Sequence, residues 1–182
     1  MIVLASKSPR RKEILSSLGY SFVVCPAVGE EVFDLNIGID SAIKEVAYHK
    51  AKEVQKQYPD DCILAADTIV YYEGKNLGKP KSRQEAIDCL CSLSNHVHEV
   101  KTGMCVLYGE QKKCVVSTTK VYFKDLSLKQ IIDYVDLNTC YDKAGSYGIQ
   151  ECDFVDHIEG SYSNVMGLDS QVVQNLLIAL KR

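Results

Sequence analysis

Apolar residues recur with two different spacings along the 182-residue chain, and their alternation predicts a mixed α/β fold. Short continuous apolar runs, typical of buried strands, occupy residues 2–4, 22–25 and 62–66. Between them, apolar positions with helical spacing predict two helices, one from Pro9 to about Gly19 and one from Asp40 or Ser41 to about Gln57. The first part of the chain therefore alternates strand and helix.

The second part of the chain reads differently, because long β stretches precede helices. The predicted strands are 69–72, 97–108 and 113–123, the last two joined by a turn at Gly109-Glu110. Predicted helices begin at the caps Ser82, Ser127 and Asp169, and residues 138–168 are rich in Gly, Asp, Ser and Tyr. The whole order predicts one domain, 1–182, with a mixed twisted sheet flanked by helices.

Charge and composition narrow the class of protein. The net charge of −3 disfavours general nucleic-acid binding, which depends on clustered Lys and Arg. No apolar run approaches the roughly 20 residues of a membrane span, and the start of the chain does not resemble a signal peptide. The eight cysteines form no C-x-x-C pair, so we expect reduced core thiols in a cytoplasmic protein, with a disulfide or metal role as the alternative.

The first candidate site is the strand-to-helix turn that contains Ser6, Ser8, Arg10 and Arg11. A helix N-terminus carries unpaired N–H groups and partial positive charge, so two arginines there are locally unfavourable. Hydroxyls, free N–H groups and guanidinium groups together suit a phosphate chain. The alternative is a capped helix with two solvated arginines.

Two further signals follow along the chain. Asp67-Thr68 comes directly after the apolar run 62–66, where a carboxylate could hold a divalent metal or orient a water molecule. Lys79, in Gly78-Lys79-Pro80, could offer its charge to phosphate, although no P-loop motif is present. A turn aspartate and a plain surface turn are the respective alternatives.

Two Gly-rich segments, 142–150 and 158–168, are also candidate binding loops. Gln150 could bond the edge of a base as donor and acceptor. Either segment could instead be ordinary turn chemistry. His96 and His98 have no carboxylate or Cys at ligand spacing, so we expect a structural role for them.

Taken together, these segments resemble the Maf family of nucleotide pyrophosphatases. The matching pieces, in the order of the family, are Leu4-Ala5-Ser6-Lys7-Ser8-Pro9-Arg10-Arg11, Ala66-Asp67-Thr68, Leu77-Gly78-Lys79-Pro80, Thr102-Gly103, Asp142-Lys143-Ala144-Gly145-Ser146-Tyr147-Gly148-Ile149-Gln150 and Asn164-Val165-Met166-Gly167-Leu168. Each piece is modest alone, and the combination is specific.

The resemblance implies a Maf/ITPase-like fold with two lobes around a central cleft. It also implies metal-dependent hydrolysis of the α–β phosphate link of a nucleoside triphosphate by a cytoplasmic homodimer. Asp67 corresponds to the catalytic proton acceptor of the family. Arg10, Thr68 and Gln150 stand at the positions that separate its branches, and they resemble the branch acting on dTTP and UTP.

The resemblance also suggests how metal and phosphate are held. A divalent cation, Mg²⁺ or Mn²⁺, would bind Asp67 together with Glu30, although the departure at Val28-Gly29-Glu30-Glu31 leaves Glu31 as the alternative acid. Of two family lysines, Lys50 and Lys52, we expect Lys52 to contact phosphate. The remaining expected substrate contacts are Ser6, Ser8, Arg10, Arg11, Thr68, Lys79 and Gln150.

A non-enzymatic alternative stays open from the sequence alone. The family has been linked to septum formation, so the chain could be a nucleotide-binding regulator of cell division. Convergent Asp, Lys and Arg positions favour catalysis over binding. A nucleic-acid-binding role is disfavoured by the acidic balance and the lack of interleaved aromatic and basic residues.

Overall fold

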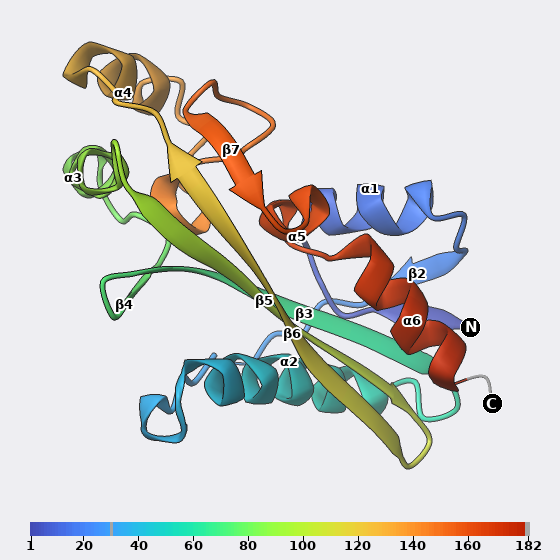
Figure 1. Cartoon of the computed structure of the whole chain (residues 1–182). Helices are drawn as coiled ribbons and strands as arrows, with labels where there is room; N and C mark the ends of the chain where they lie inside the picture. Colours follow the sequence, from blue (N-terminus) through green and yellow to red (C-terminus); the bar gives the residue numbers. More distant parts are fainter. Residues whose placement is uncertain (30, 181–182) are drawn as a thin grey trace. The chain divides into compact units, whose positions relative to one another are not determined.

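The computed structural model describes residues 1–29 and 31–180, which form a seven-stranded sheet with helices (Figure 1). The strand order is β2-β1-β3-β5-β6-β7, and β4 pairs with β3. The strands are β1 Ile2–Leu4, β2 Phe22–Val24, β3 Cys62–Tyr72, β4 Lys75–Leu77, β5 Val97–Tyr108, β6 Gln111–Phe123 and β7 Val155–Glu159. The helices are α1 Pro9–Ser17, α2 Ile39–Gln55, α3 Arg83–Leu93, α4 Leu128–Val135, α5 Tyr162–Met166 and α6 Ser170–Leu180, with 3₁₀ turns η1 Leu35–Ile37 and η2 Ala144–Ser146.

The sheet is mixed, as the sequence predicts. β1 runs parallel to both of its neighbours, β2 and β3, whereas β6 and β7 are antiparallel. The chain divides into two compact units. Unit 1 comprises 1–68, 102–117 and 167–182, and unit 2 comprises 69–101 and 118–166. Strands β3, β5 and β6 each contribute residues to both units.

Unit 1 has its own apolar core on the α2 side of the sheet. Figure 1 shows α2 on one side of this part of the sheet and α1 and α6 on the other. The α2 residues Ala47, Ala51 and Val54, which lie on one helix face, are fully buried. They pack against alternate residues of β1 and β3, such as Val3 and Ile63. The stripe predicted from the sequence therefore does form the buried face of α2.

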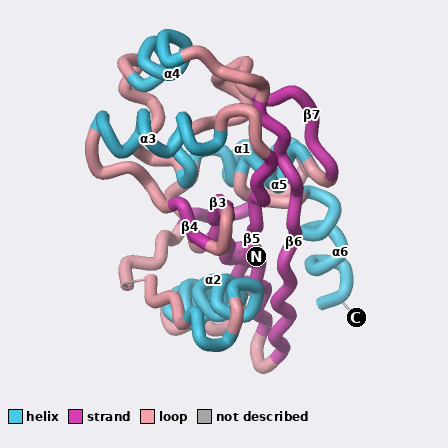
Figure 2. The backbone as a smooth tube through the Cα atoms, turned by 60° about the vertical axis from the view of Figure 1, so that its left-hand side comes forward, coloured by secondary structure: helices cyan, strands magenta, loops and turns pink. Residues whose placement is uncertain are grey.

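Unit 2 is built around an aromatic core. Helices α3 and α4 pack side by side in this unit (Figures 1 and 2). His98 is buried, and its Nε2 lies 2.7 Å from the Tyr147 hydroxyl. Its ring meets those of Phe123 and Tyr147 edge-on. The expected structural role of His98 is thus seen in its contacts.

Local signals in the sequence locate several helix ends correctly. Ser8 caps α1 with Pro9 at the first helical position, and Ser127 forms a full capping box with Gln130. Asp169 accepts hydrogen bonds from the first N–H groups of α6. The start of α2 was predicted wrongly at Asp40 or Ser41, because the helix begins at Ile39 after Gly38 without a side-chain cap.

Two strand predictions also need correction. The runs 62–66 and 69–72 are one strand, β3, which continues through Asp67 and Thr68 instead of turning there. The Gly-rich region 138–168, within which no strand or helix was predicted, contains η2, β7 and α5. Polar residues interrupt the apolar pattern in both places, and pairing with neighbouring strands maintains the extended backbone at β3 and β7.

The cysteine prediction is correct in part. Cys105 and Cys114 are joined as a disulfide, contrary to the expectation of reduced thiols, while Cys105 is fully buried as expected of a core residue. The other six cysteines are free. Within 1–29 and 31–180, the structure contains no helix with the length and apolar character needed to cross a membrane.

Gly103 allows β5 to approach α2 closely. A Cβ atom at position 103 would lie 2.5 Å from the Ile43 carbonyl oxygen, well inside van der Waals contact. We predict that Gly103→Ala lowers the free energy of unfolding by about 3 kcal/mol, because backbone must shift to admit the methyl group. Chemical denaturation measures this. Gly78→Ala, where a Cβ meets no atom within 4 Å, is the matched control and should change stability little.

His98 makes stability depend on pH. Burial lowers the pKa of His98 from 6.5 to about 4. Between these two pH values, His98 is protonated in the unfolded chain and neutral in the folded chain. The free energy of unfolding therefore decreases as pH falls from about 6.5 toward 4. We predict that His98→Gln is less sensitive, and that its stability deficit relative to wild type narrows by about 3 kcal/mol over this range.

Denaturation curves at several pH values test this prediction. His96→Gln, two residues away at an exposed position, is the control and should keep the wild-type slope. Parallel pH profiles for wild type and His98→Gln would contradict the assignment.

Candidate functional site

The N-terminus of α1 is fixed by two serine hydroxyls. The Ser8 Oγ accepts a hydrogen bond from the Arg11 N–H at 3.4 Å, which satisfies one of the free donors of the first turn. The Ser6 Oγ in turn accepts from the Ser8 N–H at 3.2 Å. The sequence-predicted residues Ser6 and Ser8 therefore shape the turn, and their hydroxyl protons can still be donated to a ligand.

Arg11 connects the start of α1 with two distant parts of unit 1. Its Nε donates to the Gly167 carbonyl at 2.8 Å, and its two terminal nitrogens donate to Ser6 Oγ at 3.1 Å and Thr68 Oγ1 at 3.0 Å. Thr68 Oγ1 also lies 2.9 Å from Thr102 Oγ1. These contacts hold the guanidinium in one orientation beside the Asp67-Thr68 pair.

Asp67 is the buried acid of this cluster, only 7% exposed. The Lys50 ammonium, on α2, lies 2.5 Å from Asp67 Oδ1 and 2.6 Å from Glu31 Oε1. One cation thus joins two carboxylates that come from β3 and from the segment before α2. The Arg11 guanidinium, from α1, lies in the same cluster as the Asp67 carboxylate.

Burial and neighbouring charges both shift the pKa values of Asp67 and Arg11 in this cluster. Burial raises the pKa of Asp67, Lys50 counteracts this, and the nearby Glu31 charge raises the pKa further. Burial also lowers the pKa of the Arg11 guanidinium, and the Asp67 carboxylate opposes that shift. A carboxylate with a raised pKa beside two cations is suited to accept a proton.

The lysine contact differs from the sequence expectation. Lys50, not Lys52, reaches the acidic pair, while Lys52 is exposed and donates to Gln55 Oε1 at 3.0 Å. Lys50 lies next to the buried stripe of α2, whereas Lys52 lies on the opposite side of the helix. The position of each lysine around the helix, given by the 3.6-residue period, is the signal that could have distinguished Lys50 from Lys52.

The metal prediction can be compared only in part. Glu30 lies outside the described residues, whereas its neighbour Glu31 joins the Asp67 cluster through Lys50. In 1–29 and 31–180, no group of three or more His, Cys, Asp or Glu side chains is placed to hold a metal by itself. Two carboxylates meet at Lys50, so a cation that also binds substrate oxygens would find part of its ligand set here.

Two other predicted segments meet in unit 2. The Gly145 N–H donates to the Gly78 carbonyl at 3.2 Å, which brings the 142–150 segment beside the loop that carries Lys79. Lys79 and Gln150 are both exposed. Lys143, which belongs to this segment, is buried and pairs with Asp142 and Glu151. The candidate base-reading side chain therefore projects from a segment held by a buried lysine.

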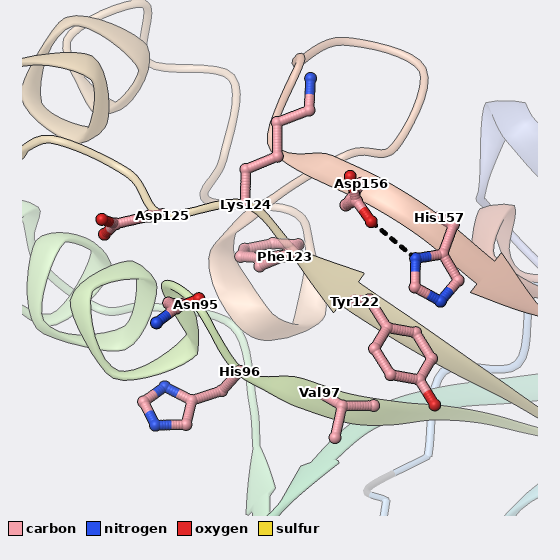
Figure 3. A pocket seen from close by; sticks show the side chains of 9 residues that line it. All are labelled: Asn95, His96, Val97, Tyr122, Phe123, Lys124, Asp125, Asp156 and His157. Carbon is pink, nitrogen blue, oxygen red and sulfur yellow. Dashed lines mark hydrogen bonds and ion pairs between the residues drawn. The ribbon is translucent and has the colours of Figure 1, made fainter.

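Unit 2 also has an open cleft of about 560 Å³ that holds none of the predicted site residues (Figure 3). Three of its lining residues contact one another. The Tyr122 and His157 rings stack with centroids 4.1 Å apart, and His157 Nδ1 lies 2.7 Å from Asp156 Oδ2. The lining is Asn95, His96, Val97, Tyr122, Phe123, Lys124, Asp125, Asp156 and His157. The cluster around Asp67, and not this cleft, is therefore the candidate active site.

Comparisons with known proteins show the family to which the chain belongs. The Maf-like protein family matches residues 1–180. A protein of Bacteroides fragilis named dTTP/UTP pyrophosphatase is 47% identical over 93% of this chain and 91% of its own length. Proteins of the same name from Halalkalibacterium halodurans (42% identical, 92% of this chain, 89% of its own) and Pyrococcus furiosus (44% identical, 97% of this chain, 93% of its own) also match. The chain belongs to the Maf family.

Proposed function

We propose that this protein hydrolyses nucleoside triphosphates, dTTP and UTP in particular, to the nucleoside monophosphate and pyrophosphate. The observation that carries the proposal is the buried Asp67 carboxylate, held between the Lys50 ammonium and the Arg11 guanidinium. The names of relatives that cover nearly the whole chain support the same reaction. We also propose, from the family resemblance, that it acts as a cytoplasmic homodimer.

We infer that a divalent metal, Mg²⁺ or Mn²⁺, completes the site. Hard carboxylate oxygens are the ligands that these ions prefer, and Asp67 and Glu31 supply a converging pair. Glu31 takes the place expected for the second acid, because its carboxylate already shares Lys50 with Asp67. When bound, the ion would supply positive charge to the triphosphate oxygens.

The side chains of the cluster divide the work of the reaction. Asp67 orients a water molecule for attack on the α-phosphorus and takes its proton, for which its raised pKa is suited. Arg10, Arg11 and Lys50 offset negative charge on the substrate and on the leaving pyrophosphate. Because Arg11 is already held by Gly167 and Thr68, little reorganisation accompanies the reaction.

Recognition of the base is assigned to Gln150 in this proposal. Gln150 offers both a donor and an acceptor, which matches the edge of a pyrimidine. Lys79, on the neighbouring loop, adds a charge for phosphate, and Lys52 stays a candidate for an outer phosphate contact.

A panel of common ribo- and deoxyribonucleoside triphosphates, incubated with the protein and Mg²⁺ or Mn²⁺, tests the proposed reaction. We expect pyrophosphate and monophosphate as products, fastest with dTTP and UTP, and no activity after chelation of the metal. Nucleotide binding without pyrophosphate release would instead support the non-enzymatic regulator.

The first prediction concerns Asp67. Asp67→Asn keeps the shape of the side chain but removes the proton acceptor, so we expect turnover to fall by about 10²-fold or more. In the wild type, activity should fall as pH drops below the raised pKa of Asp67, because the protonated acid cannot accept a proton. Steady-state pyrophosphate assays measure both effects.

Asp60→Asn is the matched control for Asp67→Asn. Asp60 is an exposed aspartate in the turn before β3, and its replacement should leave turnover unchanged. If Asp67→Asn folds normally and retains near-wild-type turnover, the acid is not the catalytic residue.

The second prediction concerns Gln150. Gln150→Ala removes the proposed base contact and leaves the Asp67 cluster intact, so we expect the ranking of bases to change while turnover of the best substrate changes less. Ratios of kcat/KM across the nucleotide panel measure this. Gln84→Ala on the exposed face of α3 is the control, and an unaltered ranking in Gln150→Ala would dismiss the assignment.

A further inference from the structure

The segment between β2 and α2 carries Glu31 into the Asp67 cluster but has little apolar anchorage of its own. Four of its large apolar residues are exposed: Val28 (82%), Val32 (73%), Leu35 (61%) and Ile37 (47%). Burial of such side chains normally fixes a loop on its scaffold. Polar contacts must therefore supply much of the force that holds this segment.

Glu53, on α2, makes a two-pronged contact with this segment. Its Oε1 accepts a hydrogen bond from the Val28 N–H at 2.8 Å, and its Oε2 accepts from the Gly29 N–H at 3.1 Å. A carboxylate that accepts two backbone N–H groups makes charge-assisted bonds, which are stronger than neutral ones. These two bonds also lower the pKa of Glu53, so the side chain stays ionised at neutral pH.

The contact is close enough to restrict the residue that it holds. A Cβ atom at Gly29 would lie 2.9 Å from Glu53 Oε2, too near for the present arrangement. The backbone of Gly29 thus approaches the carboxylate in a way that a side chain would hinder. The geometry links the two positions.

Glu53 and Lys50 act from the same side of α2. They are three residues apart, so their side chains lie near each other on the helix surface. Glu53 binds the backbone at Val28 and Gly29, and Lys50 binds the side chain of Glu31 at 2.6 Å. The segment is therefore held at two successive points by one helix turn.

We propose that Glu53 is a positioning residue that fixes the backbone ahead of Glu31, so that the Glu31 carboxylate reaches the metal-binding cluster at Asp67. This inference rests on the proposed function, because it assigns Glu31 a role in metal binding. Glu53 acts through the backbone of Val28 and Gly29 and contacts neither substrate nor metal.

The test is Glu53→Ala, with Glu53→Gln as a variant of nearly equal size. Both lose at least one of the two bonds to Val28 and Gly29. We expect the Mg²⁺ concentration for half-maximal activity to rise about 10-fold, the lower end of the effect of outer-shell partners, while kcat at saturating Mg²⁺ changes less than about 3-fold. A merely structural defect would not separate these two constants.

Hydrogen exchange of the metal-free protein gives a readout independent of activity. Peptides that cover residues 26–38 should exchange faster in Glu53→Ala than in wild type, while those of β3 stay unchanged. Glu45→Ala is the matched control, because Glu45 is on the same helix and pairs with Lys112 and His49 instead. It should leave both the metal constant and the exchange unaltered.

Gly29→Ala approaches the same contact from the other side. The added methyl group should displace the Glu53 carboxylate and raise the Mg²⁺ requirement by itself. In Gly29→Ala/Glu53→Ala the clash is gone, so the double variant should be no worse than Glu53→Ala. Additive effects would show that the two positions act independently and would overturn the inference.

The outcomes separate this inference from the proposed function. If the wild type releases no pyrophosphate from any nucleotide, the proposed function fails. If the wild type is active and Glu53→Ala keeps the wild-type Mg²⁺ requirement, the positioning role fails, whether or not exchange of residues 26–38 changes.

Discussion

The burial of a negative charge at Asp67 is the constraint on which the rest of the site depends. An isolated carboxylate away from water is strongly disfavoured, and it is kept in proteins only when cations and hydrogen bonds compensate it. Lys50 supplies a direct ion pair, and the Arg11 charge adds to it. Removing either cation would leave the buried charge of Asp67 less well compensated, so the site depends on both α1 and α2 lying beside β3.

The second cation is itself held by groups from far along the chain. Arg11 is bonded to the nearby Ser6, and the fold also brings Thr68 and the Gly167 carbonyl to it. Gly167 has a positive φ of 114°, a backbone conformation that favours glycine. The planar guanidinium is thereby oriented before any ligand arrives, and such preorganisation is a main source of electrostatic stabilisation in enzymes.

The sequence predicts the elements of this fold well wherever the pattern is local. Apolar spacing locates β1, β2, β5, β6 and α2, and capping residues such as Ser8 and Ser127 mark helix starts, because both signals act over a few residues. The short strands β4 and β7 were not predicted. The continuity of β3 through Asp67 and Thr68 is not visible in this way. β3 lies between β1 and β5 in the sheet, and such pairing is a long-range property.

The site was likewise predicted in its members more than in its contacts. Asp67, Arg11 and Thr68 do meet, but the ion pair of Lys50 with Asp67 was not predicted, because it depends on which side of α2 faces the sheet. The Glu53 contact could not be predicted from the sequence. Its partners are the backbone N–H groups of Val28 and Gly29, and the side chains of these residues do not indicate the contact. The Cys105–Cys114 bridge joins strands whose pairing had to be known first.

The division of the chain into two units has a consequence for how such a protein can change over time. The polypeptide passes from one unit to the other after residues 68, 101, 117 and 166, and the first of these crossings directly follows Asp67-Thr68. Neither unit is a continuous stretch, so no single truncation, fusion or duplication of the gene can deliver one without fragments of the other. The two halves must be inherited, expressed and lost together.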